Sequence, residues 1–252
     1  MRKVILHYHL FKNAGTSLDA AFKENFKGDE WVTAEFPAQP AKNREMVKQW
    51  IIDNPQAKCF SSHSAMLPPP KIDGVKVLPV IFLRHPIDRI ASAYEFEKKQ
   101  GGDGFGAVLA RNTDFKGYVE TRLAISNDRQ CRNFHMQRLA SMFGEKEGDE
   151  FTRAKMALKK LPFVGLVENF SGSLERLEVW LKSEGFNDVQ IKPVEKNVSR
   201  MISQSLDEKM KLIKASLGID VWMKLLMANK EDAELHLKVS KDLTINRKLN
   251  HV

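Results

Sequence analysis

Short apolar runs alternate with amphipathic stretches along most of the chain. Strands are predicted where apolar residues cluster, beginning at Ile5 and then over 31–36, 57–61, 77–83 and 163–167. Helices are predicted where apolar residues recur every three or four positions, over 16–26, 42–52, 86–94 and around Leu174, Leu177 and Trp180 or Leu181. This alternation predicts an α/β fold of the P-loop-like, three-layer type, in which helices flank a central parallel sheet.

The other stretches are less regular. Two loops are predicted, over 64–76 around three consecutive prolines and over 99–115 around a glycine-rich break. Helices are predicted over 113–125, over 130–142 and through the C-terminal part. The C-terminal helices are expected to bury Leu206, Met210, Ile213, Leu217, Trp222, Leu225 and Leu226. Because the sequence contains no repeat and no clear linker, we expect a single domain over 1–252.

Composition narrows the class of protein. A chain of 252 residues with 42% hydrophobic residues can bury about 70–75% of its unfolded surface, so a metal or disulfide staple is not required. The formal charge of +8 favours an anionic ligand, an anionic polymer or a membrane surface, and does not choose among them.

The two cysteines and the N-terminus bear on the compartment. Cys59 and Cys131 are far apart and form no Cys-x-x-Cys pair, so zinc binding and a disulfide framework are not expected. The sequence shows no signal peptide and no window of about 18 apolar residues. We therefore expect a cytoplasmic protein without a transmembrane segment, unless an anchor has been removed.

A candidate anion site follows the first predicted strand. The segment Lys12-Asn13-Ala14-Gly15-Thr16-Ser17 places a lysine, small turn residues and two hydroxyls at the start of a helix. Backbone N–H groups at such a turn point at a bound phosphate, and we expect Thr16 or Ser17 to cap the helix. The segment lacks the Gly-Lys-Ser/Thr ending of the usual nucleotide triphosphate loop.

A second candidate anion site follows the apolar run 77–83. Arg84 occupies the strand end where a magnesium-dependent NTPase or kinase has an acidic residue, and Arg89 and Ser92 share a face of the next helix. Neighbouring parallel strands end at the same edge of a sheet. Two phosphate sites without a metal carboxylate suggest a nucleotide that carries phosphate at both ends of its ribose.

These two motifs together resemble the 5′-phosphosulfate and 3′-phosphate motifs of sulfotransferases that use 3′-phosphoadenosine 5′-phosphosulfate (PAPS). The closest branch is that of the carbohydrate sulfotransferases related to heparan sulfate 2-O-sulfotransferase. The likeness continues, in the same order, through Arg132-Asn133-Phe134, 164–170 and Asn197-Val198-Ser199. Two departures are Asn13, where threonine is common, and His85, where aspartate often precedes the proline.

The resemblance implies a set of site residues. The loop Lys12, Asn13, Ala14, Gly15, Thr16 and Ser17 would hold the 5′-phosphosulfate, and Arg84, Arg89 and Ser92 the 3′-phosphate. Lys12 would also stabilise charge on the bridging oxygen as the product PAP leaves. The acceptor would be a hydroxyl, on a glycan or glycolipid, and neither a metal nor nucleic acid would be needed.

An acceptor hydroxyl must lose its proton, so a base is expected near the sulfuryl group. His63 follows the strand predicted over 57–61, and similar sulfotransferases place a histidine base there. The alternative is a loop histidine bonded to neighbouring serines. His7 and His9 alternate onto one strand face, but with no third ligand nearby we interpret them as ordinary strand residues.

Two other functions remain open from the residues. A nucleotide kinase is disfavoured by the missing Gly-Lys-Ser/Thr and by Arg84, and a non-catalytic binder of nucleic acid or another polyanion is motivated by the charge of +8. The basic residues are spread along the chain among acidic ones, which argues against a polyanion-binding tail. The acceptor and the oligomeric state are not encoded in any readable motif.

Overall fold

The computed structural model describes residues 1–193 and 204–249. Its contacts group the chain into two compact units, each made of two segments. The sheet unit comprises Met1–Leu83 and Arg138–Met201, and the helical unit comprises Arg84–Gln137 and Ile202–Val252. The single domain that we expect over 1–252 stays a prediction.

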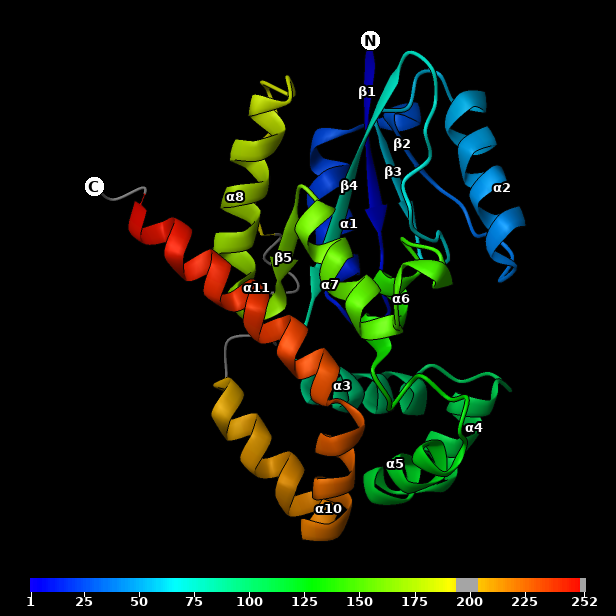
Figure 1. Ribbon diagram of the computed structural model, residues 1–252, viewed down its shortest axis with the longest axis vertical. Helices are drawn as coiled ribbons and strands as arrows, with labels where there is room; N and C mark the ends of the chain where they lie inside the picture. Colours follow the sequence, from blue (N-terminus) through cyan, green and yellow to red (C-terminus); the bar gives the residue numbers. More distant parts are fainter. Residues whose placement is uncertain (194–203, 250–252) are drawn as a thin grey trace. The chain divides into compact units, whose positions relative to one another are not determined.

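A parallel sheet forms the centre of the sheet unit (Figure 1). Its five strands lie in the order β2 (Trp31–Thr33), β3 (Cys59–Ser62), β1 (Arg2–Tyr8), β4 (Val75–Leu83) and β5 (Val164–Leu166). Every neighbouring pair is parallel, and Tyr8 is in register with both Ser62 of β3 and Ile81 of β4. The predicted α/β class is confirmed, and β1 is the central strand.

Helices cover both faces of this sheet. Helices α1 (Gly15–Asn25) and α8 (Phe170–Ser183) share one apolar cluster with the sheet, in which Phe22 and Leu177 pack with Cys59. The next residue of β3, Phe60, points to the opposite face and meets Trp50 of α2 (Pro40–Asp53) edge to face at 4.9 Å. In Figure 1, α8 and α2 accordingly lie on opposite sides of the sheet. This is the three-layer arrangement that the sequence predicts.

The helical unit surrounds a second apolar cluster. Its helices are α3 (Pro86–Lys99), α4 (Phe105–Asn112), α5 (Phe115–Ala124), α10 (Leu206–Ala228) and α11 (Lys230–Leu249). Ile90 of α3, Tyr118 of α5 and Leu217 of α10 are completely buried in this cluster. Helix α6 (Phe134–Ala140) begins in the helical unit and ends in the sheet unit.

Some predicted boundaries are wrong. The predicted loop over 99–115 contains α4, which forms because Gly106 lets it pack closely; a Cβ there would lie 2.3 Å from Arg122 and Glu97 side-chain atoms. Helix α7 (Glu150–Lys160) was not predicted, and α6 is shorter than the helix predicted over 130–142. Helices this short are marginal by themselves, so tertiary packing decides where they form and end.

One residue of the C-terminal helices that we predict to be buried is exposed. Leu226, which we expect to be buried, is 37% exposed, whereas Val221 and Leu225 are buried. Gly218, with a φ of 72°, interrupts α10. In the part that follows, Val221 and Leu225 lie four positions apart on one face, and residue 226 lies about 100° further round the helix. The predicted strand over 31–36 is likewise shortened to β2, three residues long.

Candidate functional site

The loop Lys12–Ser17 joins the central strand β1 to α1. Lys12 and Ala14 have φ angles of 62° and 58°, in the left-handed region, and the residues between and after them do not. Such alternation is typical of turns that direct successive N–H groups toward an anion. Within the turn itself, the Asn13 N–H donates to the Leu10 carbonyl at 3.2 Å and the Ser17 N–H donates to the Ala14 carbonyl at 3.1 Å. The Asn13 side chain is buried and donates to the Phe11 carbonyl at 3.0 Å, which supports the turn from within.

Helix α1 begins at Gly15, so the expected cap is wrong. Thr16 and Ser17 lie inside the first turn, and the N-cap residue is Ala14, whose methyl side chain accepts no hydrogen bond. The chain turns into the helix through the left-handed Ala14, so the hydroxyls of Thr16 and Ser17 lie two and three residues past the cap position. The first turn contains no acidic residue either. Its N–H groups and the positive end of the helix dipole therefore suit an anion.

Gly15 is required by the ring of His9. A Cβ at position 15 would lie 2.0 Å from Cδ2 and 2.2 Å from Nε2 of His9, distances that no real Cβ contact has. The His9 imidazole, only 6% exposed, thus lies directly against the start of α1. The absence of a side chain at Gly15 is what lets a histidine occupy this place.

The Asp19 carboxylate is hydrogen-bonded to His7, in β1, and to His9, just after β1. Its Oδ1 is 2.8 Å from Nδ1 of His7, and its Oδ2 is 2.9 Å from Nδ1 of His9. The Ser61 hydroxyl donates a third hydrogen bond, to Oδ1, at 2.6 Å. Sequence reasoning missed Asp19, although two histidines on one strand face opposite a helical aspartate are a signal that it could have used.

The environment keeps this carboxylate ionised. Burial by itself would raise the pKa of Asp19, but the His7 ring and the hydrogen bonds from His7, His9 and Ser61 hold that pKa well below its usual range. The expectation that no third potential metal ligand lies near His7 and His9 is wrong. One ligand atom of each of His7, His9 and Asp19 lies within 4.8 Å of the others. We interpret the cluster as a hydrogen-bonded network, because both Nδ1 atoms and both carboxylate oxygens already have partners.

His63 follows β3 and lies beside His9. The two ring centroids are 3.7 Å apart, and the His9 amide donates to the Ser62 carbonyl at 2.9 Å, which fixes the ends of β1 and β3 next to each other. The His63 amide is 3.2 Å from a carboxylate oxygen of Glu35. The sequence prediction that His63 lies at the same sheet edge as the loop is consistent with this placement.

The surroundings of His63 favour the neutral form of its imidazole. Partial burial lowers its pKa, and the neighbouring His9 lowers it further, while Glu35, Asp19 and a hydrogen bond to the His9 backbone partly oppose this. A neutral imidazole has one unprotonated nitrogen. His63 can therefore accept a proton near neutral pH.

The other predicted anion ligands belong to the helical unit. Arg84 Nε donates to Asp88 Oδ2 at 2.7 Å, within the first turn of α3, and Lys209 of α10 lies 3.9 Å from the same oxygen. Ser92 follows one turn later and is partly buried. Lys209 was not anticipated from the sequence, because only the packing of α10 on α3 brings it to Asp88.

Arg89 has a different environment from Arg84. It is 0% exposed, donates to the carbonyl and the side-chain oxygen of Gln130, and lies 4.3 Å from the centroid of the Phe134 ring. Burial lowers the pKa of Arg89 to about 10. These contacts describe an arginine that supports the fold, and its role as a phosphate ligand stays a prediction. Asn197-Val198-Ser199 lies outside the described residues.

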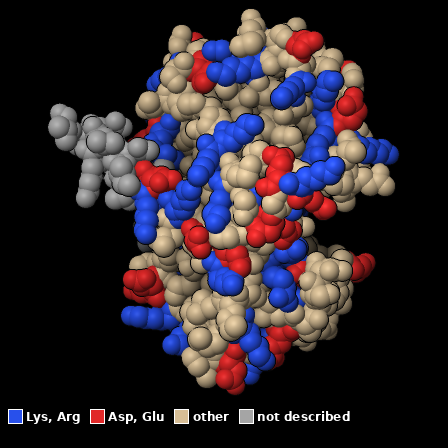
Figure 2. All heavy atoms as spheres, viewed as in Figure 1, with Lys and Arg blue, Asp and Glu red and all other residues tan. Residues whose placement is uncertain are grey.

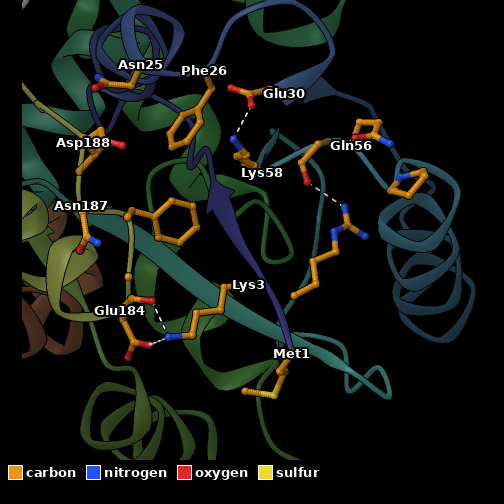
Figure 3. Close-up of a pocket in the computed structure, with 16 residues that line it drawn as sticks. Met1, Lys3, Asn25, Phe26, Glu30, Gln56, Lys58, Glu184, Asn187 and Asp188 are labelled. Atoms are coloured by element: carbon orange, nitrogen blue, oxygen red, sulfur yellow. Dashed lines mark hydrogen bonds and ion pairs between the residues drawn. The ribbon is translucent and has the colours of Figure 1, made fainter.

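The sheet unit has a separate pocket of about 680 Å³ at the other end of β1 (Figure 3). Two ion pairs lie in its lining: Lys58 is 2.5 Å from Glu30, and Lys3 is 3.7 Å from Glu184. Arg2 donates to backbone carbonyls instead, and Asp188 adds a further carboxylate to the lining. The pocket is at the strand starts, away from the edge where the loop and His63 lie. Because basic and acidic side chains line it together, the pocket is not a strongly cationic site.

No helix among the described residues combines the length and apolar character needed to cross a membrane. Both cysteines, one in each unit, are buried free thiols.

Comparison with known proteins gives one informative relationship. No family model matches the chain. The chain is 44% identical over 246 residues to an uncharacterized protein of Archaeoglobus fulgidus, with 94% of this chain and 96% of that protein covered. Similarity of this extent shows that the chain belongs to the same family as the archaeal protein.

Proposed function

We propose that this member of the family is a PAPS-dependent sulfotransferase, which moves a sulfuryl group from PAPS to a hydroxyl of a carbohydrate or glycoconjugate. One observation carries the proposal. In the sheet unit, a loop shaped for an anion leads from the central strand into an uncapped helix, and His63 follows the neighbouring strand. An anion site with a proton acceptor at its edge suits transfer of an anionic group to a hydroxyl.

The residues divide the chemistry between them. The loop N–H groups and the hydroxyls of Thr16 and Ser17 bind the 5′-phosphosulfate. His63 accepts the proton of the attacking hydroxyl as the new oxygen–sulfur bond forms and the bond from sulfur to the bridging oxygen breaks. Lys12 stabilises the negative charge that grows on that oxygen, an interaction stronger in the transition state than in the ground state.

Arg84 is the first candidate for the 3′-phosphate, by the resemblance and because a guanidinium can make a charge-assisted, two-pronged contact with a phosphate. Ser92 adds a hydroxyl from helix α3. Arg89 is a weaker candidate, since its side chain is enclosed by Gln130 and Phe134. Two buried free thiols fit a reducing compartment, so we place the reaction in the cytoplasm.

Calorimetry with PAP tests the proposal most directly. PAP is expected to bind the full chain without a metal, and AMP, which is PAP without the 3′-phosphate, is expected to bind at least tenfold more weakly, the loss of about one charge-assisted contact. Transfer is then measured with ³⁵S-labelled PAPS and a panel of glycans and glycolipids. Failure to bind PAP would overturn the proposal whatever the acceptor.

The same assays distinguish the proposed function from the two alternatives. Magnesium-dependent turnover of ATP would indicate a kinase. Binding of nucleic acid that falls steeply with salt, without selectivity for PAP, would indicate a polyanion binder. Figure 2 shows acidic side chains among the basic ones on the face in view, which does not favour the latter.

A further inference from the structure

We infer that Asp19 is a positioning residue for the proposed transfer: its two carboxylate oxygens orient the imidazoles of His7 and His9, and the oriented His9 ring supports His63. The assignment to sulfuryl transfer rests on the proposed function. The contacts that carry the inference all lie within the sheet unit.

The hydrogen bonds determine which nitrogen of each ring carries a proton. An ionised carboxylate only accepts hydrogen bonds, so each Nδ1 within 2.8–2.9 Å of Asp19 must donate its N–H. In its neutral form each ring is therefore the Nδ1-protonated tautomer, with Nε2 unprotonated. His7 is 1% exposed and His9 is 6% exposed, so solvent offers little alternative partner for either ring.

The orientation of His9 matters because several neighbours contact its ring. A methyl group at Gly15 would overlap it, the His63 ring lies at a centroid distance of 3.7 Å and an interplanar angle of 39°, and the His7 ring stacks on it at 5.2 Å. Rotation of the His9 ring would press it against the start of α1 or remove the surface on which His63 rests. Asp19 prevents that rotation through its bond to Nδ1.

Asp19→Asn is the informative substitution. The amide keeps one oxygen as an acceptor, but its nitrogen is a donor, so one of the two histidines must change tautomer or lose its partner. We expect kcat for sulfuryl transfer to fall by about tenfold to a hundredfold, the usual effect of removing the partner that orients a functional histidine. Affinity for PAP should not weaken, because the loop keeps its N–H groups and Lys12.

Long-range ¹H–¹⁵N NMR of the histidine rings supplies a readout that a merely structural role would not move. The native protein is expected to show His7 and His9 as Nδ1-protonated tautomers, and Asp19→Asn is expected to convert one of them. Glu24→Gln is the matched control, because it removes the same charge from an exposed part of the same helix. It should change neither the tautomers nor kcat.

Should Asp19→Asn fail to fold, Ser61→Ala tests the same network while keeping the carboxylate. It removes the 2.6 Å hydrogen bond to Oδ1 and the 3.1 Å contact of the same hydroxyl with Nδ1 of His7. The ring resonances of His7 are expected to shift more than those of His9, which bonds to Oδ2. Native His7 or His9 in the Nε2-protonated form would overturn the inference. So would stoichiometric binding of zinc chloride at these rings, since the cluster would then be a metal site.

The two proposals fail in different ways. Absence of PAP binding and transfer in the native protein would sink the proposed function, and the NMR measurement would still show whether Asp19 orients the two rings. Transfer that proceeds in the native protein and is unaffected by Asp19→Asn, with PAP bound normally, would instead sink the positioning role alone.

Discussion

The rings of His9 and His63 lie 3.7 Å apart, centroid to centroid, although they follow different strands of the sheet. Parallel pairing of β1 with β3 explains the contact, because it aligns the carboxyl ends of both strands. His9 lies against the first turn of α1 at Gly15, and His63 lies beside His9. Substitutions of single residues test the role proposed for this arrangement.

Lys12→Ala is expected to lower kcat by about a hundredfold to a thousandfold, the usual loss when one group that stabilises a developing oxyanion is removed. The effect on PAP affinity should be much smaller, because the charge on the bridging oxygen is largest in the transition state. Single-turnover transfer from labelled PAPS measures the first quantity and calorimetry the second. Lys27→Ala, an exposed lysine paired with Glu24, is the control. Equal losses in affinity and kcat would assign Lys12 to ground-state binding only.

His63→Ala is expected to lower kcat by about 10²–10⁴-fold, the range for loss of a general base, with PAP affinity unchanged. Retention of most of the rate would show that another group accepts the proton. His236→Ala, in the helical unit, is a suitable control because it removes an imidazole outside the sheet unit.

The pH profile follows from the direction of the His63 shift. A base acts in its neutral form, and the pKa of His63 is lowered by burial and by His9. The acid limb of kcat/KM should therefore lie below the pH of about 6.5 expected for an unperturbed imidazole. Glu35 raises the pKa of His63, so Glu35→Gln should move the limb to still lower pH. A limb that moves upward in this variant would contradict the assignment of the base.

Gly15→Ala is expected to disrupt the loop, because the new methyl group would overlap the His9 ring. Overpacking of this kind costs roughly 1–3 kcal/mol of unfolding free energy, and PAP affinity should fall as the helix start is displaced. Urea denaturation and calorimetry measure the two effects. Gly104→Ala is the control, since nothing lies within 4 Å of a Cβ at that position and its φ is negative. Wild-type stability in Gly15→Ala would mean that the ring has room to move.

Arg84→Ala and Arg89→Ala are expected to behave differently. Arg84→Ala should weaken PAP binding by about tenfold or more, a charge-assisted contact being worth roughly 1.5–3 kcal/mol. Arg89→Ala should mainly destabilise the fold, by roughly 2–3 kcal/mol, because its hydrogen bonds to Gln130 are buried. Arg111→Ala is the control, because Arg111 is an exposed residue of α4. If Arg89→Ala lost PAP affinity and kept the stability of the native protein, Arg89 would be a phosphate ligand.

Much of the architecture could be read from local pattern. The apolar run that became β4 and the Lys12–Ser17 turn are continuous stretches of chain, so hydrophobic spacing and turn chemistry specify them before any tertiary contact forms. Helix α4 was missed because its stability depends on Gly106 allowing contact with Arg122 and Glu97, which no local pattern records.

The sequence by itself predicted the alternation of strands with most of the helices, the turn after the first strand and the histidine after a neighbouring one. Only the tertiary structure decided that Asp19 holds both His7 and His9, because that contact depends on how α1 packs over β1. It also decided that Arg89 turns into the interior toward Gln130, while Arg84 pairs with Asp88. Spacing along a chain predicts which face of an element a side chain occupies, whereas its partner depends on which other element covers that face.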